Sequence, residues 1–235
     1  MTEVMAAADR SAYLRIMKLI DELKSEHERI DRVAGSLRTW VNRLLQGDAP
    51  VAEGRKFTRF FEVYVGNRHH RLEEEVLFPA VWNQLSLAAD SAPVNVLVET
   101  HHELAALLDC MKFLLRKDSL TRNELGELET LAIRYSRTLW SHIDAENSVL
   151  FPELELRLAH AGVHELASAI ITRDEEDAGI LGDALVHTYP PAEDANLVRG
   201  EGCAMCPAYM DSCRGIEREW WNEWEWEELE ERVTS

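Results

Sequence analysis

Apolar residues recur every three or four positions through the first two thirds of the chain. This spacing places side chains on one face of an α-helix, and it predicts four long helices. They should cover about residues 10–46, 52–86, 90–116 and 121–161. On the first of them the inward face consists of Ile16, Ile20, Leu23, His27, Ile30, Ala34, Leu37 and Val41.

Turn-forming residues separate these segments. Gly47-Asp48-Ala49-Pro50 stops the first helix, and Pro93 lies near the first turn of the third. Long helices with short connections predict an all-α fold, an up-down-up-down four-helix bundle.

Beyond the bundle the sequence predicts a C-terminal extension. Residues 163–188 have the pattern of one more helix, and residues 190–214 have the composition of a loop that contains cysteines. Residues 215–233 predict a short acidic helix rich in tryptophan. We therefore predict a bundle domain over residues 1–162 and an extension over residues 163–235.

Charge and composition narrow the range of partners. The net charge is −18 at pH 7, and such an acidic surface repels nucleic acid and anionic lipid, so neither is an expected partner. No apolar run approaches the roughly 18 residues that a membrane span needs. The N-terminal residues lack the pattern of a secretory signal, so the expected location is the cytoplasm.

A sequence repeat links the second and fourth predicted helices. Residues 69–79 and 142–152 both contain a histidine, a glutamate four positions later and a terminal Leu-Phe-Pro, at a constant offset of 73 positions. The surroundings of His27 and His101 repeat in the same way at an offset of 74 positions. A duplicated helix pair would give the bundle an approximate twofold axis.

Histidines and glutamates gather on the inward faces of all four predicted helices. The i,i+4 spacing within two of these helices places an imidazole and a carboxylate on one face. A single histidine on an apolar face is usually a hydrogen-bonded core residue. Two buried carboxylates, however, are costly without cations to neutralise them. The predicted metal ligands are His27, His69, Glu73, His101, His142 and Glu146.

The ligand types indicate the metal. Imidazole and carboxylate without thiolate favour iron or manganese over structural zinc. If the two glutamates bridge two ions, each ion has four protein ligands, and an oxo or hydroxo bridge would add a fifth. One position per ion then stays open for a small molecule.

The combined spacing of these six ligands, with the two Leu-Phe-Pro tails, resembles the hemerythrin HHE cation-binding domain over about residues 10–160. The resemblance implies a four-helix bundle around a carboxylate-bridged pair of iron ions. It also implies that the protein binds or reacts with dioxygen, nitric oxide or peroxide, or senses iron and oxygen.

Two positions differ from the oxygen-carrying hemerythrins. Those proteins have a fifth histidine one turn after the third-helix ligand and an aspartate five residues after the fourth-helix histidine, where this chain has Ala105 and Asn147. The four-histidine, two-glutamate set is instead similar to bacterial proteins that repair iron centres after nitrosative or oxidative stress. With an open position expected on each iron, reversible oxygen carriage should be poor.

Some nearby residues stay outside the predicted ligand set. The Leu-Phe-Pro alignment favours His69 over His70, and the apolar spacing of the third helix argues in the same way against His102. We expect these two histidines and Glu74 to flank the site. Tyr135 either lines the pocket or packs in the core.

The C-terminal extension carries two further signals. Cys203, Cys206 and Cys213 combine a CxxC motif with a third thiol, which suits a second metal site or a redox disulfide as well as unmodified loop cysteines. The apolar face of the tryptophan-rich helix would dock on the bundle, bind a protein partner or mediate self-association.

Three functions fit this sequence. The first is a di-iron protein that binds or reacts with dioxygen, peroxide or nitric oxide, in stress response or iron-centre repair. The second is a non-catalytic sensor of oxygen, nitric oxide or iron that signals through the extension. The third is an oxygen-dependent oxidase or oxygenase, which an organic substrate pocket beside the metals would favour.

Overall fold

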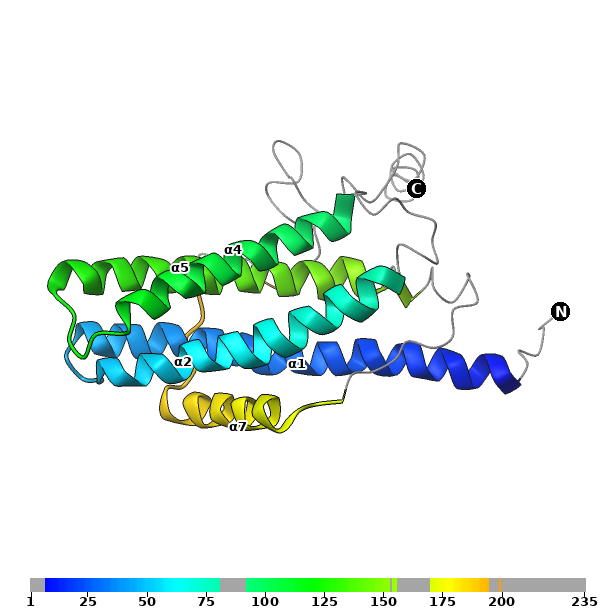
Figure 1. Ribbon diagram of the computed structural model, residues 1–235, viewed down its shortest axis with the longest axis horizontal. Helices are drawn as coiled ribbons and strands as arrows, with labels where there is room; N and C mark the ends of the chain where they lie inside the picture. The colour runs from blue at the N-terminus through cyan, green and yellow to red at the C-terminus, as the bar shows by residue number, and fades with distance from the viewer. Residues whose placement is uncertain (1–6, 81–91, 153, 156–169, 195–198, 200–235) are drawn as a thin grey trace.

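The computed structural model describes residues 7–80, 92–152, 154–155, 170–194 and 199. These residues are predominantly helical, and none of them lies in a β-strand (Figure 1). The predicted all-α class is therefore confirmed for this part of the chain. Within it, no helix is both long enough and apolar enough to cross a membrane.

The helical elements follow the predicted segments closely. They are α1 (Ala7–Leu45), η1 (Val51–Glu53), α2 (Gly54–Phe60), η2 (Phe61–His70), η3 (Glu73–Leu77), α4 (Ala92–Leu114), α5 (Arg122–Ala145), η4 (Glu146–Leu150) and α7 (Arg173–Thr188). η1 is a 3-10 turn, whereas η2, η3 and η4 are π-helical. The segment from α2 through η3 is one continuous helix that extends to residue 80, and η4 continues α5.

The described residues change one boundary of the prediction. α7 begins at Arg173, ten residues after the predicted start at residue 163, and residues 170–172 before it are not helical. The predicted ends of the second and fourth helices lie outside the described residues. So do the cysteines of the extension and the predicted tryptophan-rich helix over 215–233.

Polar caps and a glycine fix several helix ends. The Thr121 hydroxyl accepts a hydrogen bond from the Glu124 amide, and the Glu124 carboxylate accepts one from the Thr121 amide. This capping box starts α5, and Thr172 and Glu175 form the same arrangement at α7. Gly47 follows α1 with a φ of 82°, a conformation that glycine adopts without strain.

The long helical segments lie alongside one another (Figure 1). α5 packs against both α1 and α4, and η2 packs against α4. α7 lies on the outside of this group, where it contacts α1, α2 and η2. The segments that carry the predicted ligands therefore face a common interior.

Two apolar clusters fill that interior at different levels. The larger includes Trp40, Phe57 and Tyr135, and the smaller includes Leu19 and Phe78. The residues that lie between the two clusters along the helices are histidines and glutamates, and they are buried as well. A buried polar layer thus separates two apolar cores.

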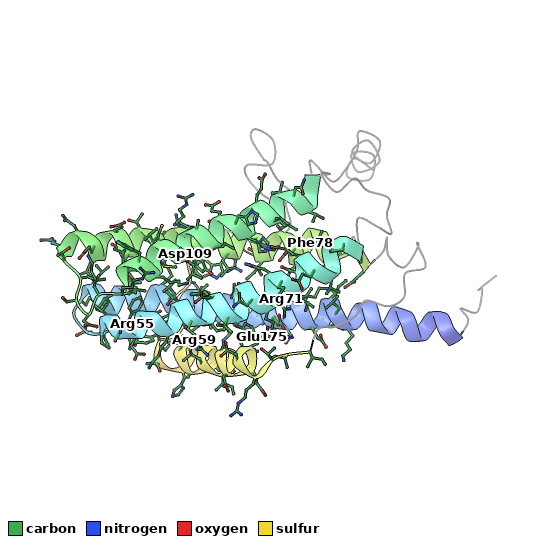
Figure 2. The ribbon with its side chains drawn as sticks, in the orientation of Figure 1. Arg55, Arg59, Arg71, Phe78, Asp109 and Glu175 are labelled. Carbon is green, nitrogen blue, oxygen red and sulfur yellow. The ribbon has the colours of Figure 1, made fainter. Side chains whose placement is uncertain are left out.

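A glycine lets α7 pack closely on the neighbouring helix. A Cβ atom at Gly182 would lie 2.5 Å from Cε2 of the fully buried Phe60. At the edge of the same contact, Nη2 of Arg71 lies 3.3 Å from Oε1 of Glu175 (Figure 2). The close approach of the α7 backbone to the Phe60 ring therefore depends on the missing side chain at position 182.

Gly182→Ala is expected to lower the free energy of unfolding by about 1–3 kcal/mol, because the new methyl group would overlap the Phe60 ring. Gly126→Ala is the matched control, since Gly126 also lies within a helix and has nothing within 4 Å of its Cβ position. The control should gain up to about 1 kcal/mol from helix propensity. Thermal unfolding measures both variants, and an equal rise in the two midpoints would contradict the close packing of α7.

Candidate metal centre

All six predicted metal ligands meet in the buried polar layer. α1 contributes one of them, the continuous helix of η2 and η3 two, α4 one, and α5 with η4 two. Each is at most 4% exposed. In chain order they are His27, His69, Glu73, His101, His142 and Glu146.

Their ligand atoms form two overlapping groups. One group consists of His27, His69, Glu73 and Glu146, and the other consists of His70, Glu73, His101 and His142. Within each group, ligand atoms from all four residues lie within 4.8 Å of one another. Glu73 belongs to both groups, because its Oε1 is 3.4 Å from Nε2 of His69 and its Oε2 is 3.4 Å from Nε2 of His101.

Glu146 also stands between the two groups. Its Oε2 is 3.1 Å from Nε2 of His27 and 3.3 Å from Nε2 of His142. Two buried carboxylates therefore separate two sets of imidazoles. This is the arrangement that would bridge a pair of cations.

The sequence led us to expect that His70 flanks the site, whereas the structure places its ring among the candidate ligands. Its ring is buried and stacks on His101 with 3.8 Å between the centroids, and it belongs to the second group of ligand atoms. On a regular α-helix only one of two adjacent histidines is expected to point inward. Because η2 is π-helical, its wider turn lets both His69 and His70 face the centre.

The other neighbours of the ligands lie outside both groups. Oε1 of Glu74 is 2.6 Å from Nδ1 of His101. His102 is exposed. Tyr135 was expected either to line the pocket or to pack in the core, and it does both. It packs against Phe61, and it borders a small cavity of about 150 Å³ beside His101.

Many polar atoms of the centre have no hydrogen-bond partner in the described part of the chain. They include both carboxylate oxygens of Glu73 and of Glu146, and Nε2 of His27, His69 and His70. Leaving one such buried atom unsatisfied costs about 1–3 kcal/mol. Cations between the side chains would satisfy all of these atoms together, so the residues fit a metal centre.

Burial also sets the protonation states that metal binding requires. Desolvation raises the pKa of the Glu73 and Glu146 carboxyl groups well above the usual value. It lowers the pKa of the His69, His70 and His142 imidazoles well below theirs. The imidazoles are therefore neutral, with a lone pair to donate. Cations would favour the ionised carboxylates, so binding should release protons.

Polar side chains orient the histidines from behind. Nδ1 of His69 is 3.0 Å from Oε2 of Glu26, and Oε1 of Glu26 accepts a hydrogen bond of 2.7 Å from Nε of Arg68. Nδ1 of His27 is 2.9 Å from Oδ1 of Asn147. When Nδ1 donates to such an oxygen, Nε2 keeps its lone pair for a metal.

The roles of Glu26 and Asn147 were not predicted from the sequence. Glu26 and Asn147 each directly adjoin a predicted ligand, but adjacency alone does not show where a polar side chain points. Asn147 was noted only as a departure from the oxygen carriers. In the structure it lies between the centre and a surface cavity, a position that the sequence does not reveal.

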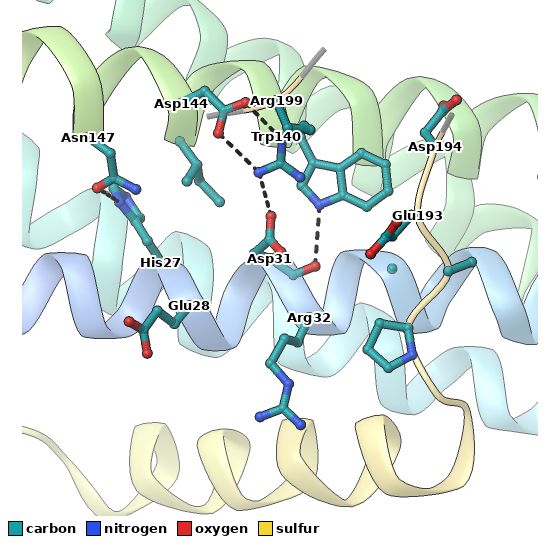
Figure 3. Close-up of a pocket in the computed structure, with 14 residues that line it drawn as sticks. His27, Glu28, Asp31, Arg32, Trp140, Asp144, Asn147, Glu193, Asp194 and Arg199 are labelled. Atoms are coloured by element: carbon teal, nitrogen blue, oxygen red, sulfur yellow. Dashed lines mark hydrogen bonds and ion pairs between the residues drawn. The ribbon is translucent and has the colours of Figure 1, made fainter. Parts of the chain in front are cut away.

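A cavity of about 980 Å³ lies beside the centre (Figure 3). His27 and Asn147 line it on the side of the metal ligands. Arg199 also lines it, with Nη2 2.5 Å from Oδ1 of Asp31 and Nε 2.8 Å from Oδ2 of Asp144. The cavity therefore brings open space as far as the His27 side of the centre.

The helical fold and this centre define a cation-binding protein. In a comparison with protein families, residues 15–154 match the hemerythrin HHE cation-binding domain. The match covers more than half of the 235 residues, so the chain belongs to this family. Neither the curated proteins nor the solved structures contain a match.

Proposed function

We propose that the protein holds two iron ions and that it binds or reacts with dioxygen, peroxide or nitric oxide. The observation that carries this proposal is the pair of overlapping ligand groups that share Glu73. The unsatisfied buried atoms of the same residues support it, since a single cation would leave one group without a partner. The surrounding helices would form the up-down-up-down bundle that the sequence predicts.

The donor set favours iron or manganese, because it combines imidazole and carboxylate without thiolate. Bound iron would supply electron-transfer chemistry towards small oxygen and nitrogen oxide molecules. The protein would orient the imidazoles through Glu26 and Asn147, and the apolar clusters on both sides of the polar layer would limit the access of water.

A role in stress response or iron-centre repair is the biological setting that we propose. The likeness of the four-histidine, two-glutamate set to bacterial repair proteins supports it. Mixing the anaerobic diferrous protein with nitric oxide, peroxide or dioxygen tests it, since turnover distinguishes a reactive protein from a sensor. A sensor would bind the ligand in a fixed stoichiometry without consuming more of it.

Oxidation of an organic substrate is a second candidate function, favoured by the cavity beside His27. Its volume of about 980 Å³ is that of a small-molecule site rather than of a channel for diatomic gases. The lining has more carboxylates than guanidinium groups, which would favour a cationic substrate; the carboxylates are Glu28, Asp31, Asp144, Glu193 and Asp194, and the guanidinium groups are Arg32 and Arg199. Oxygen uptake that rises only when an organic cation is added would support this function over the first.

Other features of the chain support narrower proposals. We propose a cytoplasmic protein that does not bind nucleic acid or membranes, since its net charge of −18 repels polyanions. We also propose that the predicted tryptophan-rich helix over 215–233 binds a protein partner or a second copy. A second metal or redox site at Cys203, Cys206 and Cys213 is a further proposal of the same kind.

Protein produced with added iron is expected to contain about two iron atoms per chain, because two ligand groups are present. Elemental analysis of the folded protein measures this content, with manganese and zinc determined in the same sample. A folded protein that binds one metal ion or none, even with excess iron, would overturn the proposal.

A further inference from the structure

We propose that His70 is a seventh protein ligand, and that it supplies the third histidine of one iron from the second helical segment instead of from position 105. This inference rests on the proposed di-iron function. It makes the two irons unequal, where the sequence alone predicts two equivalent ones.

The geometry of the second helical segment turns both His69 and His70 towards the centre. η2 spans Phe61–His70 and is π-helical, and η3 resumes the same geometry at Glu73–Leu77. In this wider helix two successive histidines turn towards the interior. The ring of His69 meets that of His27 at 4.6 Å between centroids, while the ring of His70 meets that of His101 at 3.8 Å.

The surroundings of His70 also favour a role as a metal ligand. Its side chain is 7% exposed, and its Nε2 has no hydrogen-bond partner in the described part of the chain. A structural histidine buried to this degree would normally be hydrogen-bonded. Instead it shares a cluster with Glu73, His101 and His142, the donors of the second group. Ligation of a metal ion would explain why this nitrogen has no hydrogen-bond partner among the candidate ligands.

Position 105 shows what His70 replaces. Ala105 lies one helical turn after His101 on α4. Its methyl group has no atom that can bind a metal. It borders the small cavity of about 150 Å³ that His70 and His101 also line. His70 therefore lines the same space as Ala105, and it offers an imidazole there where Ala105 offers only a methyl group.

The consequence is an unequal count of donors. The ion of the second group would have three imidazoles and the ion of the first group two, while Glu73 and Glu146 lie between them. With three imidazoles, the second group would leave an ion fewer positions for an exogenous ligand than the first group would. His27, a donor of the first group, is also the candidate ligand that lines the large cavity (Figure 3). Small ligands should therefore bind on that side.

Mössbauer spectroscopy of the 57Fe-loaded diferric protein tests this in the wild type. Two signals of equal area are expected, because the ions differ in nitrogen donors. A single signal from a protein with two irons would overturn the inference. This measurement does not depend on whether any variant folds.

His70→Ala is the matching substitution, and His102→Ala is its control, because His102 also adjoins a ligand in sequence but is exposed. Loss of an orienting group behind a ligand weakens metal binding about 10–100-fold, so loss of a direct donor should weaken binding of one iron by at least about 100-fold. Iron titration and the Mössbauer spectrum measure the change. The control should keep both irons and the wild-type spectrum.

The outcomes separate this inference from the proposed function. A wild-type protein that never holds two irons would remove the di-iron function, and the ligand role with it. A wild-type protein with two irons, together with a folded His70→Ala variant of unchanged affinity and spectrum, would overturn the role of His70 alone.

Discussion

Replacing Glu73 by alanine is expected to abolish the binding of both metal ions. Its side chain is fully buried, and its two oxygens face different groups, Oε1 towards His69 and Oε2 towards His101. Among the described residues, no other belongs to both groups. Without this carboxylate each ion loses an anionic donor, and two cations would stand close together with less negative charge between them. The iron content should fall from about two atoms per chain to nearly none.

Glu74→Ala is the matched control for this substitution. Glu74 is the next residue on the same helix, yet its carboxylate lies outside both groups and contacts Nδ1 of His101. Its loss removes an orienting hydrogen bond, so binding should weaken about 10–100-fold while both irons remain at saturating concentration. Elemental analysis and circular dichroism of both variants measure iron and folding. A folded Glu73→Ala variant that keeps one iron at wild-type affinity would show that Glu73 serves only one ion.

The sequence predicted the convergence of six side chains because that convergence depends on simple periodicity. A spacing of three or four places the histidines of α1 and α4 within apolar stripes. The i,i+4 pairs keep imidazole and carboxylate on one face even where π-helical turns begin, as at His142 and Glu146. The Leu-Phe-Pro repeat then aligned the second and fourth segments. Each of these signals is local to one helix.

The orientation of His70, the contact between His27 and Asn147 and the start of α7 depend on geometry that cannot be predicted from residue types. A π-helical stretch has no sequence signature comparable with a proline or a capping box, so the inward turn of His70 could not be predicted. The orienting contact between His27 and Asn147 joins α1 to η4, residues far apart in the sequence. The start of α7 at Arg173 was missed for a related reason. The Thr172 capping box there marks the boundary, but an apolar pattern that begins earlier obscured it.

Removing iron with a chelator is expected to lower the midpoint of thermal unfolding by about 10 °C at pH 7 to 8. The metal-free centre would hold two carboxylates that are 0% exposed and have no hydrogen-bond partners among the described residues. Leaving a buried charge uncompensated costs roughly 3–5 kcal/mol. In a protein of this size each kcal/mol corresponds to roughly 2–4 °C in the midpoint. Differential scanning calorimetry of the iron-loaded and chelated protein measures the change.

The double substitution Glu73→Gln with Glu146→Gln separates this electrostatic cost from a general loss of cross-linking by metal. Burial raises the pKa of both carboxyl groups, so the metal-free wild type near neutral pH must either take up protons or bury negative charge. The glutamine amides have nearly the same shape as the carboxyl groups, but they carry no charge and need no proton. The metal-free double variant should therefore unfold at a higher temperature than the metal-free wild type, and chelator should leave its midpoint unchanged. If the double variant is instead the less stable of the two metal-free proteins, then the buried carboxylates are not the source of the instability, and the bound metal stabilises the fold mainly by joining the helices.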